Sequence, residues 1–229
     1  KCGIRLDSGD IAYLSRKARK MLDEAGWTEC TITVSNSLDE YLIQDLWMQD
    51  AKIDAFGVGE RLITAKSEPV FGCVYKLVAV EDKDGNIVPK IKISENVGKI
   101  TTPHFKKLYR FYGRDTGKAI ADYLTVYDET VDDSQNLEIF DPDATWKRKE
   151  VYHFEARELL VPIYQKGKLV YKRPGIEEIK KYCTEQVDTL WDEVKRFDNP
   201  HNYYVDLSQK LYDIKTELLN EKNERYEKN

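Results

Sequence analysis

The sequence predicts a mixed α/β fold made of a parallel βα segment, an antiparallel β-rich segment and a helical end. Three observations predict it. Short apolar runs alternate with helical periodicity near the start, an Asp-Gly turn separates two β-rich runs in the middle, and apolar residues recur at helical spacing from Ile176 onward. We place the boundaries of the three segments at 1–68, 69–175 and 176–229.

The first segment begins with two complete βα units. Gly3 to Leu6 is predicted to be a strand, and the helix that follows it ends near Gly26, a residue suited to a C-terminal cap. Cys30 to Val34 form the next expected strand. Ser37-Leu38-Asp39-Glu40 has the spacing of a capping box, so we expect a helix from Ser37 through about Met48.

A third unit follows these two. Ile53 to Phe56 are predicted to be a strand, and Gly57-Val58-Gly59 then turns into a helix start at Glu60. Consecutive βα repeats imply a parallel sheet or part of a barrel, in which these turns gather at the carboxyl ends of neighbouring strands.

The later segments are predicted from hairpin and helix patterns. The expected hairpins pair Val74–Val80 with Ile87–Ile93, Leu108–Tyr112 with Ala119–Tyr127, and Leu159–Tyr164 with Leu169–Tyr171. A helix with one apolar face starts at Ile176, and Pro200 separates it from a second helix over about Val205–Glu221. The charged stretch Asn220–Asn229 is expected to fray.

Composition narrows the function classes. The chain has 229 residues, 41% of them hydrophobic, which suffices for a real core. A net charge of −5 argues against a nucleic-acid partner. We expect a cytoplasmic protein with reduced thiols and no membrane partner, because no apolar run approaches the ~20 residues of a membrane helix. The four cysteines and three histidines are scattered and predict no metal cluster.

The candidate binding residues lie in the three turns. With strand alternation, Arg5 and Asp7 point to the same side, so Arg5 is placed to hold a phosphate and Asp7 to bind ribose hydroxyls or a hydrated Mg²⁺. The other turns offer hydroxyls, amides and flexible glycines suited to an anion. The full predicted set is Arg5, Asp7, Ser8, Gly9, Ser35, Asn36, Ser37, Gly57, Val58, Gly59 and Glu60.

Structural roles remain open for the same residues. Arg5 and Asp7 could form only a local salt bridge, with Ser8 or Asp10 capping the next helix. Ser35 to Ser37 would then be a helix cap and the glycine pair a plain turn. No catalytic partner is evident for the three histidines, of which His104 is expected to be a solvated loop residue.

Three ordered motifs together resemble the nicotinate phosphoribosyltransferase family. They are Gly3-Ile4-Arg5-Leu6-Asp7-Ser8-Gly9-Asp10, Ser35-Asn36-Ser37-Leu38-Asp39-Glu40 and Asp54-Ala55-Phe56-Gly57-Val58-Gly59, and the match extends to Gly72–Leu77 and Asp188–Trp191. The resemblance implies the C-terminal part of an irregular α/β barrel, followed by antiparallel strands and a helical end.

The resemblance also implies an activity. Members join nicotinate to 5-phosphoribosyl 1-pyrophosphate with Mg²⁺, releasing nicotinate mononucleotide and pyrophosphate, and coupled ATP hydrolysis drives this salvage step of NAD synthesis. In the family pattern Arg5 and Asp7 face the phosphoribosyl group. The segments Ser35–Ser37 and Gly57–Gly59 cradle its 5′-phosphate.

Two departures from the family pattern qualify these implications. Glu60 stands where many relatives carry a small hydroxyl residue, and its carboxylate would repel a phosphate unless it turned away or paired with Arg61. The chain runs within three residues of Lys1 into an expected buried strand and contains no histidine in a matching motif. We therefore expect the C-terminal half of such an enzyme, inactive alone, with its catalytic residues unknown and a homodimer as the full-length state.

Three rival functions remain. Nicotinamide phosphoribosyltransferase shares the fold and similar motifs. A non-catalytic structural or interaction module would keep the turns only as caps. An unrelated sugar-phosphate barrel enzyme is disfavoured by the antiparallel middle and the helical end.

Overall fold

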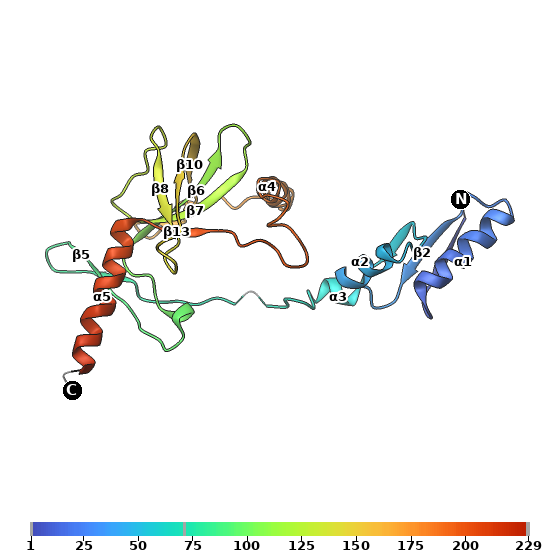
Figure 1. Cartoon of the computed structure of the whole chain (residues 1–229), viewed down its shortest axis with the longest axis horizontal. Helices are drawn as coiled ribbons and strands as arrows, with labels where there is room; N and C mark the ends of the chain where they lie inside the picture. Colours follow the sequence, from blue (N-terminus) through green and yellow to red (C-terminus); the bar gives the residue numbers. More distant parts are fainter. Residues whose placement is uncertain (1, 71, 228–229) are drawn as a thin grey trace. The chain divides into compact units, whose positions relative to one another are not determined.

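The computed structural model describes residues 2–70 and 72–227 and consists of two compact units, Lys1–Val74 and Tyr75–Asn229 (Figure 1). Lys1, at which we expected the chain to be cut, lies outside the described residues. The antiparallel segment and the helical end share the second unit, while the three-segment boundaries stay a prediction. In the described ranges, no helix combines the length and apolar character needed to cross a bilayer.

The first unit is the predicted βαβαβ arrangement with an open parallel sheet in the order β1-β2-β3. Leu6 pairs with Val34, and Ser35 with Gly57, so the strands end side by side. The elements of the first unit are β1 (Gly3–Leu6), α1 (Ile11–Glu24), β2 (Thr31–Ser35), α2 (Glu40–Met48), β3 (Ala55–Gly57) and α3 (Glu60–Ile63).

The core of the first unit lies on one face of this sheet. Ile32 and Val34 of β2 are fully buried against Ala12 of α1 and Leu46 of α2. Strand alternation sends Arg5 and the other odd-numbered positions of β1 to the opposite face. One face therefore stabilises the unit, and the other carries polar side chains.

The expected end of α1 is confirmed. Gly26 adopts a φ of +79°, and its N–H donates to the Asp23 carbonyl while Trp27 donates to Leu22. This pair of bonds is a Schellman motif, which satisfies the last carbonyls of the helix.

The second unit is built on a four-stranded sheet in the order β10-β6-β7-β13, with β13 parallel to β7 and the other pairs antiparallel. Its strands are β6 (Lys106–Gly113), β7 (Ala119–Val126), β10 (Phe154–Glu158) and β13 (Val205–Leu207). The remaining elements are β4 (Ala79–Glu81), β5 (Ile87–Pro89), the 3₁₀ helix Val97–Lys99, β8 (Leu137–Phe140), β9 (Arg148–Val151), β11 (Tyr164–Gln165), β12 (Lys168–Leu169), α4 (Ile176–Asp188) and α5 (Gln209–Glu227).

All three expected hairpins form, but two have shorter strands than predicted. β6 pairs with β7 over most of the expected length, whereas β4–β5 and β11–β12 pair over only three and two residues per strand. The unexpected hairpin β8–β9 packs Ile139 and Val151 against Phe111 and Phe154, which are fully buried. This hairpin covers one face of the sheet.

The expected helix over Val205–Glu221 is wrong at both ends. Val205 belongs to β13, because pairing with β7 outweighs the local helical pattern. Helix α5 begins at Gln209, where the Ser208 hydroxyl accepts from the Leu211 N–H, and continues to Glu227. The stretch expected to fray is therefore helical over its described part, and residues 228–229 lie outside it.

Candidate functional site

Arg5, Asp7 and Ser35 form one bonded set at the carboxyl ends of β1 and β2. The Arg5 Nε donates to the Ser35 hydroxyl at 2.8 Å, and the guanidinium forms an ion pair with Asp7 at 2.7 Å. The Ser35 hydroxyl in turn donates to the same Asp7 carboxylate at 2.8 Å. The side chains of Arg5 and Asp7 remain 63% and 55% exposed, so this set is held in place yet open to a ligand.

The loop between β1 and α1 joins this set to the first helix. The N-cap of α1 is Asp10, whose carboxylate accepts a hydrogen bond from the Tyr13 N–H at 2.9 Å. Of the two predicted caps, Ser8 and Asp10, the structure therefore shows Asp10. Ser8 is exposed and free of the capping role, and Gly9 adopts a φ of +79°, the left-handed region that glycine favours. Ser8 and Gly9 therefore form an exposed turn directly after Asp7, between the end of β1 and the start of α1.

The turn after β2 does not cap α2, which corrects the expected role of Ser37. Asp39 caps the helix instead, with its carboxylate accepting from the Leu42 N–H at 2.9 Å. Asn36 and Ser37 adopt φ values of 108° and 49°, a conformation rare for residues other than glycine. In the described part of the chain, neither of their N–H groups donates a hydrogen bond, so both are available to an anion.

An ion pair that sequence reasoning missed ties the second turn to the third. The Arg61 guanidinium bonds to the Asp39 carboxylate, so Arg61 does not pair with Glu60. The Leu42 N–H, and then Arg61, lower the pKa of Asp39. No sequence pattern indicated this contact, because its partners are far apart along the chain. Glu60 is exposed and opens α3.

The third turn packs closely against the second. A Cβ added at Gly57 would approach the Ser35 Cβ at 3.3 Å, so glycine lets these two strand ends lie together. The Val58 side chain packs into the core, which leaves only its backbone to face a ligand. Gly59 is the N-cap residue of α3 and provides no side-chain cap. The predicted residues of all three turns thus meet at one edge of the sheet.

The remaining candidates have structural surroundings. His104 is buried and stacked on Tyr127, which corrects its expected solvation. His153 lies 3.1 Å from the Asp115 carboxylate in an exposed turn. Cys2 and Cys30 meet at the starts of β1 and β2, and this contact raises the pKa of Cys30. None of the four cysteines, all of which lie in the described ranges, forms a disulfide.

Comparison with known proteins identifies the relatives of the chain. Residues 105–215 match the model of the nicotinate phosphoribosyltransferase C-terminal domain. Nicotinate phosphoribosyltransferase of Bacillus subtilis is 47% identical over 98% of this chain and 46% of its own, and that of Dictyostelium discoideum is 32% identical over 92% and 37%. The crystal structure of human nicotinic acid phosphoribosyltransferase is 25% identical with a TM-score of 0.68, covering 95% of this chain and 40% of that one.

The fold and these likenesses place the chain among the C-terminal portions of phosphoribosyltransferases. The chain belongs to the nicotinate phosphoribosyltransferase family and matches its C-terminal portion. It spans less than half the length of the curated relatives it matches.

Proposed function

We propose that the sheet edge of the first unit binds the phosphoribosyl group of 5-phosphoribosyl 1-pyrophosphate in the nicotinate phosphoribosyltransferase reaction of NAD salvage. The observation that carries this proposal is the bonded set of Arg5, Asp7 and Ser35 beside two turns with available N–H groups. The 47% identity to the Bacillus subtilis enzyme supports the same reaction. Nicotinate is preferred to nicotinamide because the relatives carry that name.

The chemistry of the set suits a sugar phosphate. The second terminal nitrogen of Arg5 has no acceptor among the described residues, so the guanidinium can bond a phosphate while it keeps Asp7 and Ser35. The N–H groups of Asn36 and Ser37 add donors of fixed direction. The Glu60 carboxylate disfavours a phosphate beside its side chain, so this residue is proposed to contribute only its backbone.

Asp7 fits the indirect Mg²⁺ site that the family reaction requires. Mg²⁺ usually keeps several of its waters in such sites, and the exposed Asp7 carboxylate would hold the hydrated ion by accepting hydrogen bonds from those waters. When bound, Mg²⁺ would neutralise charge on the departing pyrophosphate. We further propose that the full-length enzyme selects nicotinate, couples the reaction to ATP hydrolysis and acts as a cytoplasmic homodimer. The inactivity of the isolated chain stays a prediction.

Replacing Arg5 with methionine is expected to weaken binding of phosphoribosyl pyrophosphate about tenfold to a hundredfold. Hydrogen bonds from a charged group are worth about 1.5–3 kcal/mol, and methionine keeps the aliphatic stem while it removes them. Isothermal titration of the full chain with this ligand and Mg²⁺ measures the change. Arg5→Lys should recover part of the affinity, because it keeps the charge without the planar fork.

Lys20→Met is the matched control, since it removes one positive charge from exposed α1 away from the sheet edge. Its affinity should equal that of the unaltered chain. Equal affinities for Arg5→Met and Lys20→Met, or no measurable binding by the unaltered chain, would overturn the proposal.

A further inference from the structure

A cavity of about 410 Å³ lies in the second unit, between the β8–β9 hairpin and the part of the four-stranded sheet formed by β7 and β13. Ala121, Ile139 and Phe140 line it and are almost fully buried. Its size falls in the range of about 300–1,000 Å³ that is common for small-molecule sites. The cavity belongs to a different unit from the phosphoribosyl site.

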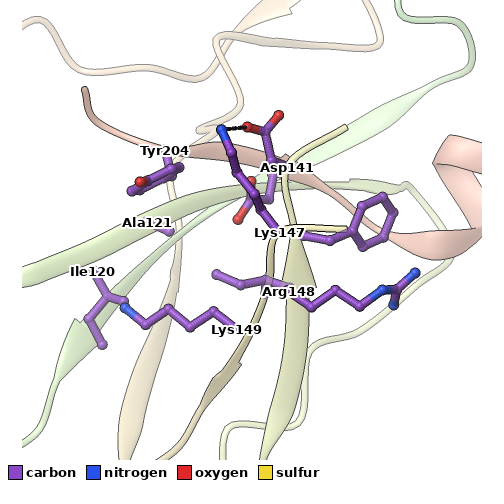
Figure 2. A pocket seen from close by; sticks show the side chains of 10 residues that line it. Ile120, Ala121, Asp141, Lys147, Arg148, Lys149 and Tyr204 are labelled. Carbon is purple, nitrogen blue, oxygen red and sulfur yellow. Dashed lines mark ion pairs between the residues drawn. The ribbon is translucent and has the colours of Figure 1, made fainter. Parts of the chain in front are cut away.

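A β-bulge and strand alternation supply the walls of this cavity. Ala119 and Ala121 pair with successive residues of β6, which leaves Ile120 between them unpaired and turned to the cavity. In Figure 2, Lys149 extends toward Ile120, whereas Arg148 extends the opposite way. Lys149 therefore brings an ammonium group to the apolar wall.

Asp206 is a buried acidic residue whose carboxylate lines this cavity. It is only 4% exposed and lines the cavity, yet within the described residues its carboxylate has neither a hydrogen bond nor an ion pair. Burial raises its pKa to about 6, with a further increase from Asp141 and an opposing effect of Lys149. A buried carboxylate without a partner destabilises a fold because its lost hydration is not replaced. A cationic group of a ligand bound beside Asp206 would offset this desolvation free energy.

The other charges around the cavity are already paired. Lys147 forms an ion pair with Asp141 at 3.6 Å, the dashed line in Figure 2, and Arg148 pairs with Glu138. Asp206 and Lys149 form no ion pair with each other, although the Lys149 charge lowers the pKa of Asp206. The cavity thus presents one available anion, one available cation and an apolar surface between them.

We propose that this cavity binds an α-amino acid with a large apolar side chain. The ligand ammonium would pair with Asp206 and its carboxylate with Lys149. Its side chain would lie on Ile120 and the ring of Tyr204, which is 44% exposed at the cavity wall. A zwitterion matches both available charges at once, whereas a simple amine or a simple acid matches only one.

Three matched probes test this assignment by isothermal titration of the full chain at pH 7.5. L-phenylalanine carries both charges, phenethylamine lacks the carboxylate, and 3-phenylpropanoate lacks the ammonium. We expect L-phenylalanine to bind at least about tenfold more tightly than either analogue, because each analogue leaves one charged group without its partner. No binding of L-phenylalanine at millimolar concentration, or equal binding of either analogue, would overturn the proposal.

Variants then locate the binding. Asp206→Asn and Lys149→Met should each weaken L-phenylalanine binding by about tenfold or more. Lys149 is exposed, so its variant folds even if the buried position proves sensitive, and thermal melting checks both. Lys90→Met, a loss of the same charge outside the cavity lining, should leave the affinity unchanged. Unchanged affinity in Lys149→Met would contradict the assignment.

Discussion

Replacing Phe111 with alanine is expected to lower the free energy of unfolding of the second unit by about 3–5 kcal/mol. Phe111 is fully buried, and its ring lies 4.7 Å from that of Phe154 and 5.3 Å from that of Tyr123, measured between centroids. These rings join the sheet to the β8–β9 hairpin, so a cavity here loosens both layers. Denaturant unfolding followed by tyrosine and tryptophan fluorescence measures the loss.

Phe105 provides the control for this core prediction. It carries the same side chain but is 58% exposed, so Phe105→Ala should cost about 1 kcal/mol or less. If the two variants lost equal stability, the assignment of Phe111 to the centre of the core would be wrong.

Asp122→Ala is expected to destabilise the second unit by about 3–5 kcal/mol, because it leaves a largely buried Arg110 without its anion. Asp122 accepts two bonds from Arg110, at 2.7 and 2.9 Å, and a third from the Tyr203 hydroxyl at 3.0 Å. The side chains of Arg110 and Asp122 are 21% and 11% exposed. Thermal and denaturant unfolding of the variant measure the effect.

Two further variants separate a buried pair from a surface pair. The double change Arg110→Met with Asp122→Leu should recover most of the loss, since it removes both charges together. Asp128→Ala breaks the exposed ion pair with Lys210 and should have a much smaller effect. An Asp122→Ala loss no greater than that of Asp128→Ala would contradict the account.

Local pattern was sufficient to predict the elements that position the proposed phosphoribosyl site. The three parallel strands follow from short apolar runs, and the alternation of Arg5 and Asp7 predicted that they share a side, which their 2.7 Å ion pair confirms. The C-terminal end of α1 followed from the freedom of Gly26 to adopt a positive φ.

Contacts between distant residues could not be predicted in the same way. Ser37 and Asp39 both have spacings suited to a helix cap, and Asp39 takes the role while it also bonds to Arg61, 22 residues away. Val205 has a helical pattern but joins a sheet through β7. The cavity around Asp206 depends on a bulge and on a hairpin that local pattern did not predict.

The most direct test of the central claim is an amide-resolved ¹⁵N NMR titration of the full chain with phosphoribosyl pyrophosphate and Mg²⁺. The account predicts that the amide signals of Asn36, Ser37, Gly57 and Gly59 shift together and saturate at one ligand concentration, while those of α1 beyond its first turn stay in place. Shifts confined to other parts of the chain, or no shift in either turn at millimolar ligand, would contradict the claim that these strand ends form one phosphoribosyl-binding edge.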